Sequence, residues 1–120
     1  MDAGIYRYHT DGHILARLLS GDLRKKLTQA GLHQNAIAKA PATIAIFAVY
    51  DRTTIKYGDR GIRYVHMEAG HTAQNICLQA VALGLGSVAI GAFHDEEVQR
   101  VIGTEPNQQP LYLIPIGTPD

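Results

Sequence analysis

The sequence has little of what marks several large classes of protein. It contains a single cysteine, Cys77, so the chain can form no internal disulfide. Its 11 basic and 11 acidic residues cancel, and a chain without net charge has no overall basic field to attract nucleic acid or an anionic membrane. It shows no signal peptide, and no apolar run is long enough to span a bilayer. We therefore expect a cytoplasmic protein that binds neither nucleic acid nor membrane.

A metal-binding pattern is also missing. His9 and His13 are four residues apart but straddle a turn. His66 and His71 are five apart, which places them on different faces of a helix. No HExxH motif and no Cys/His cluster occurs, and Cys77 lies in an apolar stretch where an inert core thiol is expected. We predict no metal site.

What is present is the composition of one globular domain. The 120 residues are 46% hydrophobic and 18% charged, which suits a modest single core. No internal repeat, linker or low-complexity segment divides them. We expect residues 1–120 to form a single domain.

The stretch from Gly61 to Phe93 is the feature around which the chain is organised. Its first part, as far as Leu83, has no proline and repeats apolar residues at three- and four-residue steps, the period of a helix. Other apolar residues lie elsewhere around this helix, so we expect a central helix that is buried on most of its sides. The main stripe is Ile62, Val65, Ala69, Ala73, Ile76, Ala80 and Leu83; the others are Tyr64, Met67, Leu78 and Val81.

The remaining segments predict a mixture of short strands and helices. The strands are expected at Ile5–Tyr8, His13–Leu19, Thr43–Tyr50, Ser87–Phe93 and Leu111–Ile116. Helices are expected from the N-cap Asp22 to Ala30, over His33–Lys39 and over His94–Ile102, with Asp51–Arg60 as a polar interruption. Pro115 suggests that the last strand lies at a sheet edge or ends there. The predicted class is α+β, with a small mixed or antiparallel sheet packed on the long helix.

The glycine-rich segment Gly84–Ala89 (GLGSVA) does not fit a dinucleotide-binding fingerprint. That fingerprint needs a strand before the glycines and a helix after them, so that the pyrophosphate meets a helix N-terminus. Here the helix comes first, which favours a glycine-rich helix C-cap. The glycine inside the following strand, Gly91, is typical of a place where a flat ligand or another backbone comes near.

A basic stripe leaves two interpretations open. Its members recur at steps of four, four and three, and they are Arg52, Lys56, Arg60 and Arg63. On an unbroken helix they would form a site for a phosphate or an acidic substrate, but Gly58 and Gly61 interrupt such a helix. The alternative is a solvated face whose acidic partners come from neighbouring positions.

The order and spacing of seven motifs resemble the nitroreductase superfamily over essentially the whole chain. They are Gly4–Tyr8 (GIYRY), Lys56–Arg60 (KYGDR), Arg63-Tyr64, Glu68–Asn75 (EAGHTAQN), Leu83–Gly86 (LGLG), Gly91–Phe93 (GAF) and Leu111–Gly117 (LYLIPIG). More narrowly, the set is similar to the SagB-type dehydrogenase branch, which includes the azoline oxidases of thiazole and oxazole biosynthesis.

The resemblance implies an FMN-dependent oxidoreductase that transfers hydride through flavin N5. It implies a homodimer with the flavin at the subunit interface, and NAD(P)H is a candidate electron donor. The residues expected against the flavin are Ala89, Ile90, Gly91 and Ala92, with the backbone N–H near Gly91 facing N5. Lys56 and Tyr57 match the pair with which azoline oxidases remove a substrate proton, so a small molecule or a peptide-derived heterocycle is the expected substrate.

The sequence departs from the family in one respect that bears on the cofactor. Members begin with an Arg-x-Ser-x-Arg segment that grips the FMN phosphate and carry an Ala-Gly-Ala/Gly-x-x-Pro segment over the flavin, and neither occurs here. Three expectations remain open: a fragment or shortened product, a second polypeptide that supplies the rest, or a fold that has lost its flavin. The competing function is therefore a cofactor-free dimerisation or binding module.

Overall fold

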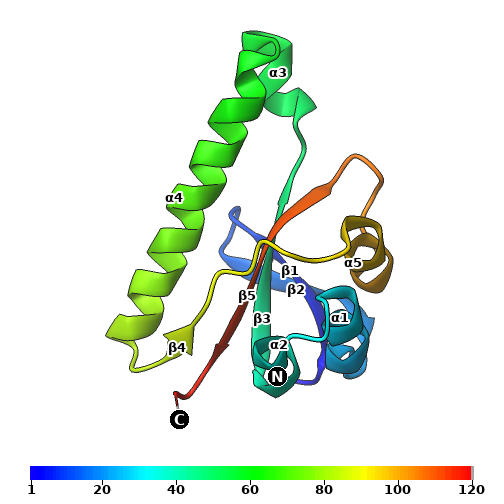
Figure 1. Ribbon diagram of the computed structural model, residues 1–120, viewed down its shortest axis with the longest axis vertical. Helices are drawn as coiled ribbons and strands as arrows, with labels where there is room; N and C mark the ends of the chain where they lie inside the picture. Colours follow the sequence, from blue (N-terminus) through cyan, green and yellow to red (C-terminus); the bar gives the residue numbers. More distant parts are fainter. Residues whose placement is uncertain (120) are drawn as a thin grey trace.

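The computed structural model describes residues 1–119 and has the predicted α+β architecture. Figure 1 shows the long helix along one side of a small sheet, with the first two helices and the last one on the other side and the remaining short helix at the start of the long one. In chain order the elements are β1 Gly4–His9, β2 Ile14–Ser20, α1 Arg24–Ala30, α2 Asn35–Lys39, β3 Ala42–Ala48, α3 Asp51–Tyr57, α4 Arg60–Ala82, β4 Gly86–Ser87, α5 Asp95–Ile102 and β5 Gln109–Gly117.

The central sheet has three strands in the order β3-β5-β4, and all of its pairs are antiparallel. Leu113 of β5 is fully buried in a core cluster with Ala30, Ile37, Ile90 and Val98. Ile114, the next residue, is also fully buried but lies outside that cluster, because alternate strand residues face opposite sides of a sheet. Its side is the one that α4 covers (Figure 1).

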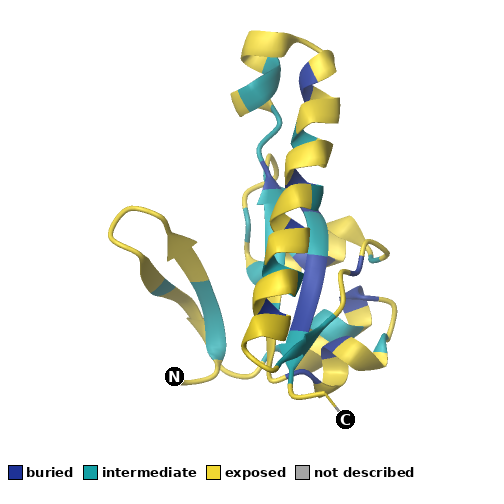
Figure 2. Cartoon of the chain, turned by 90° about the vertical axis from the view of Figure 1, so that its left-hand side faces the viewer, coloured by how far each residue is buried: buried dark blue, intermediate teal, exposed yellow. Residues whose placement is uncertain are grey.

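Strands β1 and β2 form a separate antiparallel hairpin, as the sequence predicts. Figure 2 shows the hairpin standing apart from the rest of the chain. Several of its apolar side chains are exposed, namely Ile14, Leu15, Leu18 and Leu19.

Helix α4 has one covered side and one open side. The predicted stripe supplies the covered side, where Ala69, Ala73 and Ala80 are buried. The expectation that the helix is buried on most sides is wrong for the single chain, because Met67, Leu78 and Val81 are 52%, 59% and 73% exposed. The yellow outer face of α4 in Figure 2 shows this directly.

The end of α4 confirms the prediction of a glycine-based C-cap. Gly84 has a φ of 74°, its N–H donates to the Val81 carbonyl (3.0 Å), and the Leu85 N–H donates to the Ala80 carbonyl (2.8 Å). These two bonds form a Schellman motif, which satisfies carbonyls at the helix end. The chain then turns back toward the sheet.

The predicted boundaries around α1 and α3 are wrong. Asp51–Arg60 is not a plain polar interruption, because Asp51–Tyr57 forms α3. Helix α1 begins at Arg24 after the cap residue Leu23, although the Asp22 side chain still accepts the Arg24 N–H (3.1 Å).

The predicted strand over Ser87–Phe93 is also wrong in extent. Only Gly86–Ser87 is a regular strand, and Ile90 adds one isolated bridge to Leu113. Pro115 explains the gap. It lies in the middle strand rather than at an edge, its carbonyl accepts the Val88 N–H (3.4 Å), and it has no N–H to return to this segment.

Candidate functional site

Lys56 and Tyr57 lie in the last turn of α3, at a tight elbow between α3 and α4. Gly58 ends α3 with a φ of 61°, and its N–H donates to the Thr54 carbonyl (2.7 Å). Gly61 is buried against the Thr54 backbone, where a Cβ would approach to 3.1 Å. The elbow therefore holds both candidate proton-handling groups at a defined position.

The two candidate side chains interact with one another and with α4. The Lys56 ammonium lies 5.3 Å from the centre of the Tyr57 ring, within the range of a cation–π contact. The Tyr57 ring meets Tyr64 edge to face, with 5.2 Å between ring centres. Tyr57 is 49% exposed, so a ligand could reach this residue.

The segment Ala89–Ala92 runs beside β5 and leaves its backbone open. Ile90 is buried, whereas Ala89, Gly91 and Ala92 are exposed. A Cβ built on Gly91 would meet no atom within 4 Å. Among residues 1–119, no backbone carbonyl accepts the Gly91 N–H. This open stretch of peptide is the kind of surface on which a flat ring can lie.

The direction of the Gly91 N–H follows from the pairing of Ile90. The Ile90 N–H donates to the Leu113 carbonyl (2.9 Å), and the Leu113 N–H donates to the Ile90 carbonyl (3.0 Å). The Ile90–Gly91 peptide is trans, so the Gly91 N–H points opposite to the Ile90 carbonyl. It therefore points away from β5.

A single chain does not bring the two groups of candidate residues together. Helix α3 lies beyond the N-terminal end of α4, whereas β4 and the start of the next segment lie at its other end (Figure 1). Ile90 lies opposite Leu113, which pairs with Ala45 in the middle of β3, whereas α3 begins only beyond the end of β3. Lys56 and Tyr57 are thus separated from Ala89–Ala92 within one copy of the chain.

Gln34 holds the segment that contains Gly91 in place, a role that the sequence patterns did not reveal. Its side-chain amide donates to the Ala92 carbonyl (2.9 Å) and to the Gly31 carbonyl (2.8 Å). The His94 N–H also donates to the Ala30 carbonyl (2.9 Å). The partners are 58 residues apart for Gln34 and Ala92, and no local pattern links them.

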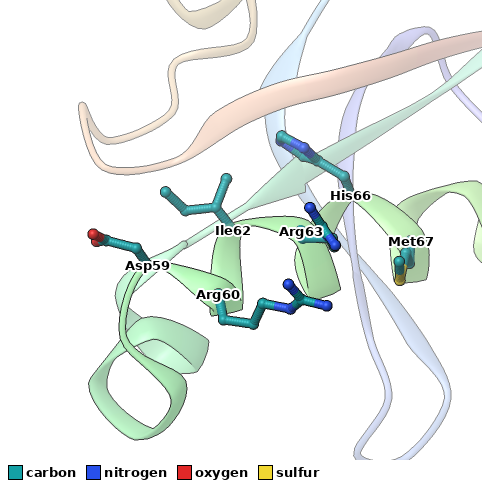
Figure 3. Close-up of a pocket in the computed structure, with 6 residues that line it drawn as sticks. All are labelled: Asp59, Arg60, Ile62, Arg63, His66 and Met67. Atoms are coloured by element: carbon teal, nitrogen blue, oxygen red, sulfur yellow. The ribbon is translucent and has the colours of Figure 1, made fainter.

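A surface hollow of about 590 Å³ lies along the first turns of α4. Figure 3 shows the six residues that line it, Asp59, Arg60, Ile62, Arg63, His66 and Met67. The Asp59 carboxylate points away from both guanidinium groups in this view (Figure 3). In the described part of the chain, neither Arg60 nor Arg63 forms an ion pair. The break at Gly58 assigns Arg52 and Lys56 to a different helix, so the continuous basic stripe does not form.

One edge of the hollow is fixed by a tyrosine–histidine pair. The Tyr50 hydroxyl lies 2.6 Å from Nε2 of His66, and the rings meet edge to face at 5.6 Å. Burial, with a smaller effect of the Asp95 charge, raises the pKa of Tyr50, so the phenol keeps its proton at neutral pH.

The structure also bears on the remaining site expectations. Within residues 1–119, no group of three His, Cys, Asp or Glu side chains is placed to hold a metal ion. Cys77 is half-buried in α4. No helix in the described range is long and apolar enough to cross a membrane.

Comparison with known proteins assigns this α+β domain to a family. The model of the Nitroreductase family matches residues 6–118, and the chain therefore belongs to that family, as its motifs predicted. Over 117 residues the chain is 45% identical to Putative nitroreductase MJ1384 of Methanocaldococcus jannaschii, a match that covers 98% of this chain and 58% of the relative.

Two solved structures show the same architecture. A putative nitroreductase from Anabaena variabilis has a TM-score of 0.94 and 32% identity, over 100% of this chain and 25% of its own. An NADPH:FMN oxidoreductase from Vibrio harveyi, solved with NAD+, has a TM-score of 0.69 and 25% identity, over 82% of this chain and 46% of its own. The chain thus spans less than two thirds of the length of each relative.

Proposed function

We propose that this chain carries the ring-binding segment and the proton-handling residues of an FMN-dependent oxidoreductase of SagB type. The observation that carries the proposal is the open backbone at Gly91, whose N–H is directed away from β5 and has no backbone partner among residues 1–119. The segment fits a flavin in two ways. Its exposed peptide and small side chains leave room for a flat ring, and the Gly91 N–H is free to donate a hydrogen bond to the edge of that ring. When bound, FMN supplies the hydride chemistry at N5.

Within this proposal Lys56 and Tyr57 handle the substrate proton. An ammonium and a phenol side by side can hold and release a proton at a substrate carbon or nitrogen, provided the substrate reaches the elbow. A peptide-derived heterocycle is the substrate class that the Lys-Tyr pair favours, and NAD(P)H is the proposed electron donor where the reaction runs as a reduction.

The proposal includes a homodimer. The outer side of α4 leaves Met67, Leu78 and Val81 uncovered, and these residues follow one face of the helix at steps of eleven and three. A second copy packed along this face would cover them. It would also allow residues from two chains to contribute to one site, which the separation of Lys56 from Gly91 within a single chain requires.

A competing function is a dimerisation or binding module without flavin. The observation that favours it is the uncovered outer face of α4, which a second copy or another partner would cover whether or not a flavin is bound. The two proposals differ in what the chain does with a flavin ring, so they can be separated by one titration.

The test is a titration of the purified chain with FMN and, separately, with riboflavin, followed by flavin absorbance and fluorescence. A charge-assisted phosphate contact is worth about 1.5–3 kcal/mol, so a chain that holds the ring without a phosphate grip should bind both within about threefold. Failure to take up either flavin would reject the oxidoreductase proposal in favour of the binding module. Much tighter binding of FMN would show that this chain does grip the phosphate.

A further inference from the structure

The side chain of Gln34 forms hydrogen bonds with two carbonyl groups outside the helix that it begins. Gln34 is the N-cap residue of α2, yet its side chain forms no capping bond to that helix. Both hydrogens of its amide nitrogen are instead directed at carbonyls, those of Gly31 (2.8 Å) and Ala92 (2.9 Å). The side chain thus joins the α1–α2 turn to the segment that contains Gly91.

The turn that presents Gln34 is held in a costly conformation. Leu32 and His33 both have positive φ, 61° and 57°, which is rare for residues other than glycine. Gly31 before them is buried, and a Cβ there would collide with the Ile37 side chain. The His33 N–H donates to the Thr28 carbonyl (2.8 Å), which ties the turn back to α1. Backbone strain of this kind persists only where the surroundings enforce it.

We propose that Gln34 is a positioning residue that fixes the direction of the Gly91 N–H toward the flavin ring edge, an inference that rests on the proposed function. The Ile90–Leu113 bridge pins the peptide on one side of Gly91, and Gln34 pins the Ala92 carbonyl on the other. His94 is held to Ala30 just beyond. With both sides fixed, the N–H between them cannot rotate without breaking a hydrogen bond.

The arrangement also strengthens the donor. The carbonyl of the Ile90–Gly91 peptide already accepts a hydrogen bond, and this polarises the N–H at the other end of the same peptide. A donor whose direction is set before the ligand arrives loses little conformational freedom on binding. Removal of the Gln34 amide should therefore weaken flavin binding and make the bound flavin harder to reduce.

Gln99 provides a matched control for this test. Its side-chain amide also donates to a carbonyl, that of Gln108 (2.7 Å), but it does so in α5 and in the loop before β5. Gln34→Leu and Gln99→Leu remove the same groups and the same kind of bond. Only the first of them touches the segment around Gly91.

The experiment compares wild type, Gln34→Leu and Gln99→Leu in three measurements. Without flavin, NMR order parameters and amide exchange should show that Gly91 becomes mobile only in Gln34→Leu. With added FMN, Gln34→Leu should bind roughly three- to tenfold more weakly, the usual value of one net hydrogen bond. The reduction potential of the bound flavin should become more negative in Gln34→Leu and stay unchanged in Gln99→Leu.

The outcomes separate the inference from the proposed function. If wild type binds flavin and the two variants behave alike, Gln34 has only a structural role and the inference is wrong. If wild type binds no flavin, the proposed function fails, and the inference fails with it even where Gly91 becomes mobile.

A donor-retaining variant guards against a loss of folding. Gln34→Lys places an ammonium with three donors at a similar reach. It should restore the order of Gly91 in the flavin-free protein relative to Gln34→Leu. A folded Gln34→Lys chain in which Gly91 is as mobile as in Gln34→Leu would contradict the proposal that the hydrogen bond from residue 34 to the Ala92 carbonyl positions Gly91.

Discussion

At the scale of single residues, the proposed flavin site depends on Gly91. Its open surroundings mean that a side chain would fit the folded chain but would occupy the space in which we propose the flavin ring lies. Gly91→Val should therefore leave the melting temperature nearly unchanged and weaken flavin binding by about tenfold or more, since overpacking costs about 1–3 kcal/mol.

The control for Gly91→Val is Ala36→Val, which adds bulk to an exposed residue of α2. Flavin fluorescence titrations of both variants check the prediction. Equal affinities for FMN in the two variants would show that the ring does not lie at Gly91.

Asp22 provides a pH dependence at the same scale. Hydrogen bonds from the Arg24 side chain and backbone lower the pKa of the Asp22 carboxyl from 3.8 to about 2. Because the folded pKa is the lower one, the stabilisation is complete above about pH 4 and is lost as the pH falls toward 2. An NMR titration of the Asp22 carboxyl carbon should show its midpoint near 2.

Asp22→Asn is the comparison for that titration. Its stability should lack the part of the pH dependence that this ion pair contributes. The pair is exposed, so the change should be small and should shrink further in high salt. A carboxyl that titrates at its ordinary value in the folded wild type would show that the pair does not persist in solution.

At the scale of elements, the end of α4 determines how the chain returns to the sheet. The Schellman motif needs a left-handed residue at Gly84, whose φ is 74°. Gly84→Ala should lower the free energy of unfolding by about 1–2 kcal/mol, because L-residues pay that penalty in this conformation. Urea unfolding of the flavin-free protein measures it.

Gly91→Ala is the matched substitution for Gly84→Ala. Gly91 does not have a positive φ and has open space for a Cβ, so alanine there should be neutral or stabilise by up to about 1 kcal/mol. Equal losses in both variants would mean that the left-handed conformation is not what Gly84 contributes.

Also at this scale, the sequence predicted elements whose signals are local. The period of α4, its glycine stop and the hairpin turn were read correctly because each depends on neighbouring residues. The predicted extent of the strand after Gly84 is wrong, because the length of that strand depends on Pro115, which lies opposite Val88 in β5. The sequence could not show that β5 is the middle strand, since strand order is a long-range property.

At the scale of the whole molecule, one chain leaves apolar side chains on the outer side of α4 uncovered. Val81, in the last turn of α4, is 73% exposed, and Leu78, one turn before it, is 59% exposed. Val81→Glu should weaken self-association by about tenfold or more, because a carboxylate buried in an apolar interface without a partner costs more than 1.4 kcal/mol. Sedimentation equilibrium measures the change.

Leu32→Glu makes the corresponding change on the other side of the molecule. Leu32 is 44% exposed in the α1–α2 turn, away from α4 in Figure 1. This variant should associate as wild type does. A monomeric wild-type chain at all concentrations, or dissociation by Leu32→Glu alone, would refute a dimer that uses the outer face of α4.

The sequence by itself determined the family, the helical period of α4 and the place where it stops, because these follow from motifs and from residues close together in the chain. It also singled out Gly91, since a glycine in an apolar run is a local signal. Only the tertiary structure decided that Ile90 is paired with Leu113, that Gln34 is bonded to Ala92 across 58 residues, and that α3, which carries Lys56, lies beyond the end of β3 and away from Ile90. The physical reason is that hydrogen bonds and packing between distant segments depend on how the chain returns, which no local spacing encodes.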